Sequence, residues 1–197
     1  MRALPEDPVV QTNGCRLLAH IAVNDSNQLA IAKECGVKAV LMAMKNFPCD
    51  SAIQESSCRV LGLLSYHSET QQYVTRLGGI EATLAAMDSC GSPEVLVSGC
   101  STLTCLAVTE KNIDRIRDEK GVERVVSAMK KFEDHSDLQL TGCLALKLFA
   151  ETKEVAKQVV AEGGEAVIRS AMKRFSESAE LLKEAQDALD NIKKHST

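Results

Sequence analysis

The stretch GVERVVSAMKKF at residues 121–132 decides the fold, because related stretches recur along the chain. The other three begin at Gly36, Gly79 and Gly164, so the glycines are 43, 42 and 43 residues apart. A methionine follows each glycine at the same distance, at Met44, Met87, Met129 and Met172. A fixed period of this size is typical of proteins built from stacked structural repeats.

A second set of residues has the same period. Four cysteines are again 43, 42 and 43 residues apart, at Cys15, Cys58, Cys100 and Cys143. Each follows a glycine or serine and precedes an apolar run. Their spacing includes no Cys-x-x-Cys pair, so we interpret them as buried, apolar thiols and not as metal ligands or disulfides.

Each period predicts three helices. Residues 69–77 indicate a short polar helix, and Gly78 and Gly79 then end it, as glycine does at a left-handed turn. Residues 80–87 predict a second helix and residues 94–108 a longer third one. One such unit does not bury its apolar face alone, so we expect the units to stack into an all-α superhelix.

This glycine-marked, three-helix unit resembles the armadillo repeat. The resemblance covers residues 9–195 and implies one domain over residues 1–197. We predict an α-α superhelix (armadillo-type solenoid) with a partial repeat at residues 8–24, followed by four full repeats at residues 25–67, 68–109, 110–151 and 152–195. HEAT repeats are the alternative, but they usually have two helices per unit and lack the glycine turn.

The resemblance implies a binding function, because armadillo proteins usually hold a partner segment in a concave groove lined by their third helices. In the peptide-binding members resembling importin-α and β-catenin, a Trp and an Asn mark this groove. This chain has no Trp, and Asn stands at the corresponding position only at Asn191. The resemblance therefore implies a binding surface, without recognition of nuclear localisation signals.

The third helix of the 110–151 repeat carries two apolar faces. Residues 138, 142, 145, 146 and 149 form the predicted core face, and Leu140, Leu144 and Leu148 form a second stripe. This stripe either meets a partner or is buried between adjacent third helices. By analogy along the chain, the predicted groove contacts are Arg16, His20, Arg59, Leu63, Ser101, Cys105, Leu140, Leu144, Leu148 and Asn191.

Composition narrows the function. A net charge of −4 and a pI near 5.6 argue against nucleic-acid binding. No apolar run approaches the roughly 18–20 residues of a membrane span, and the start of the chain lacks the apolar core of a signal peptide. We therefore expect reduced cysteines and a cytoplasmic or nuclear location. No phosphate-binding loop, metal motif or catalytic constellation is present, so we predict a protein that is not an enzyme and needs no cofactor.

The apolar helix predicted from Val9 to Val23 has no preceding helices to cover it. Three interpretations stay open: the N-terminal tail folds over it, it pairs with another chain as a homodimer, or the chain is cut from a longer array. The leading functional hypothesis is a scaffold that binds a protein or peptide in the groove. The alternatives are a self-associating structural or spacer array, or a fragment of a larger signalling or cytoskeletal scaffold.

Overall fold

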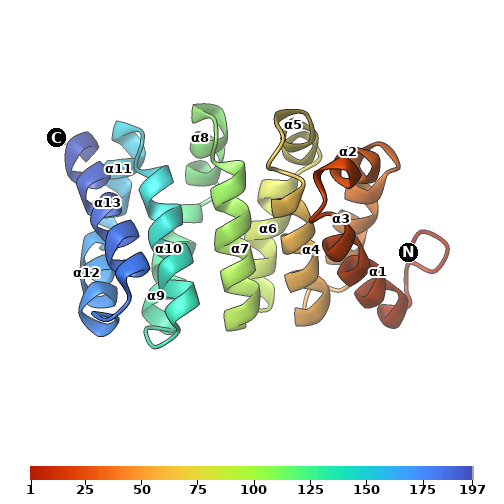
Figure 1. Ribbon diagram of the computed structural model, residues 1–197, viewed down its shortest axis with the longest axis horizontal. Helices are drawn as coiled ribbons and strands as arrows, with labels where there is room; N and C mark the ends of the chain where they lie inside the picture. Colours follow the sequence, from red (N-terminus) through yellow and green to blue (C-terminus); the bar gives the residue numbers. More distant parts are fainter. Residues whose placement is uncertain (197) are drawn as a thin grey trace. The chain divides into compact units, whose positions relative to one another are not determined.

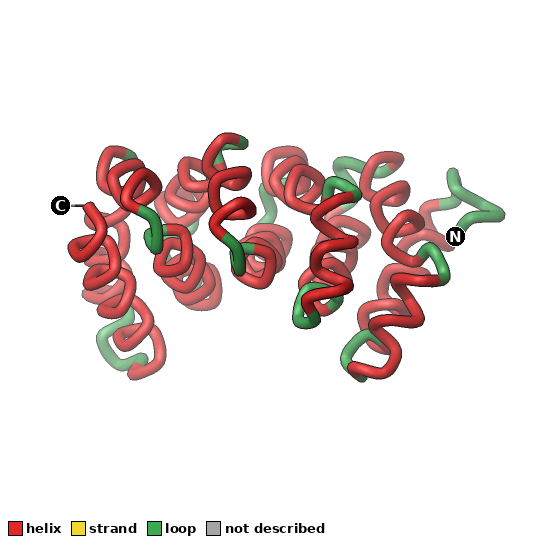
Figure 2. The backbone as a smooth tube through the Cα atoms, turned by 90° about the horizontal axis from the view of Figure 1, so that it is seen from above, coloured by secondary structure: helices red, strands yellow, loops and turns green. Residues whose placement is uncertain are grey.

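The computed structural model describes residues 1–196 and shows thirteen α-helices, with no strand in that range (Figure 1). Short loops join the helices throughout (Figure 2). The predicted all-α fold is therefore confirmed. The helices form two compact units, of which the first is Met1–Leu106 and the second begins at Ala107. The assignment of all repeats to one domain stays a prediction.

Unit 1 holds seven helices and unit 2 holds six. In unit 1 they are α1 (Pro8–Ile21), α2 (Asp25–Lys33), α3 (Gly36–Asn46), α4 (Ser51–Leu63), α5 (Ser68–Arg76), α6 (Gly79–Ser89) and α7 (Pro93–Leu106). In unit 2 they are α8 (Glu110–Asp118), α9 (Gly121–Lys131), α10 (Ser136–Phe149), α11 (Lys153–Ala161), α12 (Gly164–Arg174) and α13 (Ala179–Ser196).

After α1, the helices follow one another as a short, a medium and a long helix. The short ones have nine residues and the medium ones eleven, while the long ones range from 13 residues in α4 to 18 in α13. Within unit 1 the third helices α1, α4 and α7 pack side by side, with α2 and α5 along the upper edge in Figure 1. Within unit 2, α13 contacts α10, α11 and α12.

The repeated cysteines lie in the core. Cys15, Cys58, Cys100 and Cys143 are all fully buried, which confirms their predicted role as apolar core residues. Burial raises the pKa of Cys58, Cys100 and Cys143 to about 12, so these thiols stay protonated at neutral pH. The predicted core face of the third helix at residues 136–149 is also confirmed, because all five of its residues are buried.

The repeated glycine is needed for a close approach between helices. At the glycine pair, the predicted left-handed turn is confirmed at Gly78 (φ 92°), whereas Gly79 does not have a positive φ. A Cβ placed on Gly121 would lie 2.8 Å from the carbonyl oxygen of Ile116, in the preceding helix. The left-handed residue always comes one position earlier, at Cys35, Gly78, Lys120 and Gly163.

A buried glutamine ties a third helix to the end of the second helix before it. Gln139 Nε2 donates to the carbonyl oxygens of Met129 at 2.9 Å and Phe132 at 3.0 Å. The last carbonyl groups of a helix lack donors within that helix, so the amide supplies hydrogen bonds at the end of α9. The same arrangement occurs two repeats earlier, from Gln54 to Met44 (2.8 Å) and Phe47 (2.9 Å).

For α1, the N-terminal tail takes the place of a preceding second helix and supplies the carbonyl oxygens. Gln11 Nε2 donates to the carbonyl oxygens of Met1 at 3.0 Å and Leu4 at 2.7 Å. Met1 also packs against the cluster that contains Cys15. The tail therefore covers this side of α1, as expected from the interpretation in which the N-terminal tail folds over the first helix.

Candidate functional site

Six of the ten predicted contact residues belong to unit 1 and lie on helices that pack side by side. Three of them directly follow a repeated cysteine: Arg16, Arg59 and Ser101. The other three, His20, Leu63 and Cys105, lie one helical turn later, so equivalent positions repeat on α1, α4 and α7. None of the six is buried. We call this surface the third-helix face of unit 1, consisting of Arg16, His20, Arg59, Leu63, Ser101 and Cys105.

Two positive charges dominate one end of this face. Arg16 on α1 and Arg59 on α4 are both exposed, and within residues 1–196 neither guanidinium is paired with a carboxylate. His20 lies one turn after Arg16, and its Nδ1 is 2.7 Å from the Arg16 carbonyl oxygen. Because a carbonyl oxygen only accepts, Nδ1 carries the proton and donates. Positive charge is therefore concentrated where α1 and α4 meet.

An aromatic residue that the sequence interpretation missed borders this face. Tyr66 follows α4 and is 69% exposed, and its hydroxyl interacts with the Cys105 thiol on α7. Negative charge on Cys105 raises the pKa of Tyr66, and burial raises the pKa of the half-buried Cys105. The sequence did offer a signal for this residue, because Tyr66 is one of two tyrosines in the chain and comes directly after a third helix.

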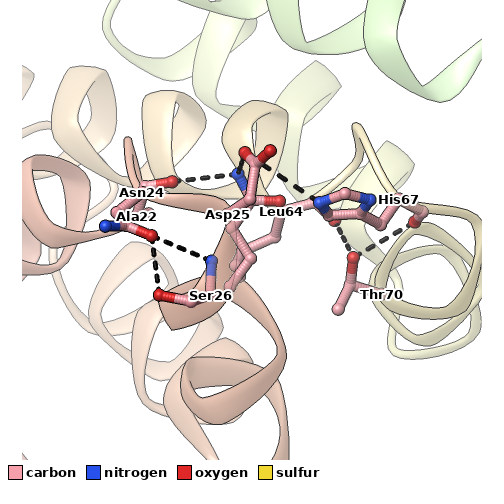
Figure 3. Close-up of polar contacts among 8 residues, drawn as sticks. Ala22, Asn24, Asp25, Ser26, Leu64, His67 and Thr70 are labelled. Atoms are coloured by element: carbon pink, nitrogen blue, oxygen red, sulfur yellow. Dashed lines mark hydrogen bonds and ion pairs between the residues drawn. The ribbon is translucent and has the colours of Figure 1, made fainter.

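The turn between α1 and α2 follows His20 on the chain and carries several polar contacts (Figure 3). Asn24 caps α2 by accepting from the Ser26 backbone N–H at 3.0 Å. Asp25 lies 3.9 Å from Nε2 of His67 in the next such turn, a long and exposed contact that contributes little stability. An open cavity of about 610 Å³ adjoins this turn, lined by His20, Ile21, Val23, Asn24, Asp25 and Asn27.

The other four predicted contacts lie in unit 2. Leu140, Leu144 and Leu148 on α10 are half-buried, so each keeps part of its surface in solvent. Asn191 on α13 is also half-buried, and its Nδ2 donates to the Lys147 carbonyl oxygen at 3.2 Å. Part of the hydrogen-bonding capacity of Asn191 is therefore already used inside unit 2.

An ion-pair cluster lies next to the α10 leucines and was not predicted. Lys147 Nζ contacts the carboxylate of Glu184 and lies 3.7 Å from that of Asp187, both on α13. The hydrogen bond to Glu184 raises the pKa of Lys147, and Lys147 in turn lowers the pKa of Glu184. These opposite shifts keep both groups charged around neutral pH, so the cluster links α10 to α13.

The described part of the chain contains no group of three or more His, Cys, Asp or Glu side chains arranged to hold a metal ion. In residues 1–196 there is likewise no helix with the length and apolar character needed to cross a membrane.

The repeated three-helix units and their exposed third-helix faces define an α-helical repeat protein of the armadillo type. The family described as "LRRK2 ARM repeat" matches residues 1–194, and the chain therefore belongs to this family. The predicted armadillo resemblance is thus confirmed. Armadillo repeats typically bind proteins and are generally not enzymes, so the family and the fold together suggest a protein-interaction scaffold.

Solved structures share this fold. One crystal structure of an engineered protein matches with a TM-score of 0.85 at 23% identity, covering 95% of this chain and 76% of the engineered one. A second has a TM-score of 0.81 at 28% identity, covering 95% of this chain and 45% of its own. A third has a TM-score of 0.60 at 24% identity, covering 96% of this chain and 92% of its own. Among curated proteins, no sequence matches.

Proposed function

We propose that this protein is an interaction scaffold whose third-helix face in unit 1 binds an acidic, partly apolar segment of a partner protein. The observation that carries the proposal is the pair of exposed, unpaired guanidinium groups of Arg16 and Arg59. Arginine forms two parallel hydrogen bonds with a carboxylate, so two such groups on neighbouring helices suit two acidic side chains.

Apolar and aromatic groups next to these charges supply the second component of binding. Leu63 lies one turn after Arg59 and is half-buried, and the exposed ring of Tyr66 follows at the end of α4. Arginine and tyrosine are over-represented among the residues that contribute most to protein interfaces. The ligand should therefore combine carboxylates with an apolar anchor, and we place this interaction in the cytoplasm or nucleus.

The test is selection of binders from a random peptide library, first with the wild-type chain and then with R16E/R59E. We expect the wild type to select peptides rich in Asp and Glu with an apolar residue nearby. Reversing both charges replaces attraction by repulsion and should weaken binding of those peptides by roughly 10- to 100-fold. Isothermal titration with one selected peptide measures the change.

The matched control is K33E/K38E, which reverses two exposed positive charges on α2 and α3 and so leaves the face intact. It should change the affinity by less than about threefold at 0.15 M salt, because screening weakens charges that lie away from the contact. Neutral or basic selected peptides, or equal losses in both variants, would contradict the proposal. L144D/L148D tests whether the α10 leucines of unit 2 also contribute to binding.

Self-association through α1 is a second candidate function. Leu17 is 62% exposed and Ile21 39% exposed. The residues at the equivalent positions are buried in α4, α7, α10 and α13 alike, so α1 presents a core-type surface to solvent. A second copy of the chain that packs its own α1 against this surface would form a symmetric dimer.

Sedimentation across a dilution series tests this dimer. If it forms, the wild type should change from monomer to dimer with concentration, and L17D/I21D should remain monomeric with an unchanged melting temperature, since both side chains are exposed. V160D, which alters an exposed valine on α11, serves as the control. A wild type that stays monomeric at the highest concentration would rule the dimer out.

A further inference from the structure

Two cysteines outside the buried set come together in unit 1. Cys49 lies in the turn before α4, and Cys90 lies in the turn before α7; both helices begin at the lower edge of Figure 1. The Cys90 thiol donates to the carbonyl oxygen of Pro48 at 3.2 Å. That carbonyl belongs to the peptide bond that joins Pro48 to Cys49, so the Cys90 sulfur lies beside the Cys49 backbone.

The surroundings of this pair allow chemistry that the buried cysteines do not. Cys49 is exposed and Cys90 is half-buried, and both are free thiols. The pKa of Cys90 is raised by burial and then by charge on Cys49 and Asp50. Cys58 and Cys100, in the adjoining helices, are fully buried and hence inaccessible to an oxidant.

We propose that Cys49 and Cys90 form a reversible disulfide when the protein meets hydrogen peroxide. The Cys49 thiolate attacks one peroxide oxygen and the O–O bond breaks, which gives a Cys49 sulfenic acid and a hydroxide that takes up the proton released by the Cys49 thiol as one water. The Cys90 thiolate then attacks the Cys49 sulfur, an S–S bond forms, and the hydroxide that leaves takes up the Cys90 proton as a second water. Two thiols lose two electrons in total, and the peroxide gains them.

The disulfide would join two consecutive three-helix sets. It would connect the turns that precede α4 and α7, the helices that carry Arg59 and Ser101 on the third-helix face. Such a bond restricts the unfolded chain by closing the loop between the two cysteines, and it holds the two helix starts at a fixed separation. Oxidation would therefore stiffen the surface to which we assign binding, although the bond itself does not depend on that assignment.

The experiment treats the whole chain with a small excess of hydrogen peroxide at pH 7 and at pH 8.5, followed by alkylation and peptide mass mapping. We expect one pair of peptides, containing Cys49 and Cys90, joined with the loss of two hydrogen atoms. Formation should be faster at pH 8.5, because the raised pKa of Cys90 limits its thiolate at pH 7. The melting temperature should rise by roughly 5–10 °C and return on reduction.

C49S and C90S should each abolish the joined peptides and the rise in melting temperature. C35S and C105S change the other two cysteines that are not buried, and they should form the bond as the wild type does. Substitution at these accessible positions is not expected to prevent folding. A link to Cys35 or Cys105, a link between two chains, or oxidation of Cys49 to a sulfinic acid without any link would each overturn the proposal.

Discussion

Replacing Gln139 by alanine is expected to lower the free energy of unfolding by about 2–4 kcal/mol. The side chain is 2% exposed, and its amide bonds the carbonyl oxygens of Met129 and Phe132. Alanine removes both hydrogen bonds, leaves a buried carbonyl at the end of α9 short of a donor, and opens a cavity. Urea denaturation followed by circular dichroism measures the difference.

Two further variants separate the hydrogen bonds from the cavity. Gln139→Leu keeps most of the volume, as Leu96 does at the equivalent position of α7, and should recover only the cavity part of the loss. Gln72→Ala changes an exposed glutamine on α5 and should stay within about 0.5 kcal/mol of the wild type. If Gln139→Leu is as stable as the wild type, the two carbonyl contacts contribute nothing to the stability of the protein.

The repeat architecture could be predicted from the sequence because it depends on spacing alone. The glycine at the start of each second helix and the cysteine inside each third helix repeat at intervals of 42 or 43 residues, so each marks one structural position without knowledge of any contact. Periodicity also separated the faces of α10, because every third or fourth residue of a helix points the same way. The buried Leu138 and the half-buried Leu144 follow that pattern.

Contacts that connect different elements could not be predicted in this way. Tyr66 meets Cys105 and Lys147 meets Glu184 only because adjacent third helices pack side by side, and neither pair has a spacing rule of its own. The N-terminal tail is a further case. Its backbone carbonyls, and not its side chains, take the place of a helix end before Gln11, and backbone positions are not visible in a residue pattern.

The repeated glycine shows how a correct pattern can receive an incomplete physical reason. Glycine was expected for its freedom to adopt positive φ, yet the left-handed position is occupied by Cys35 in one repeat and Lys120 in another. What all four repeats share is the lack of a Cβ one position later, against the carbonyl of the preceding helix. Because Gly121 itself does not have a positive φ, the first reason predicts tolerance of alanine there, whereas the second predicts intolerance.

Gly121→Ala is therefore expected to destabilise the protein by about 1–3 kcal/mol, since the added Cβ would lie 2.8 Å from the Ile116 carbonyl oxygen, a backbone atom that moves only with its helix. The neighbouring change Lys120→Gly should act in the opposite direction. Lys120 has a φ of 59°, and glycine removes a left-handed strain of about 1 kcal/mol from a position that is already exposed.

Measuring both variants by urea denaturation distinguishes the two explanations of the glycine, because their signs differ at adjacent residues. A close approach between α8 and α9 requires loss of stability at residue 121 together with a gain, or no change, at residue 120. If Gly121→Ala were as stable as the wild type, the helices would have room to separate, and the period of the glycines would need another cause. Gly164→Ala repeats the test in the next repeat, where the corresponding distance to the Val159 carbonyl oxygen is 2.9 Å.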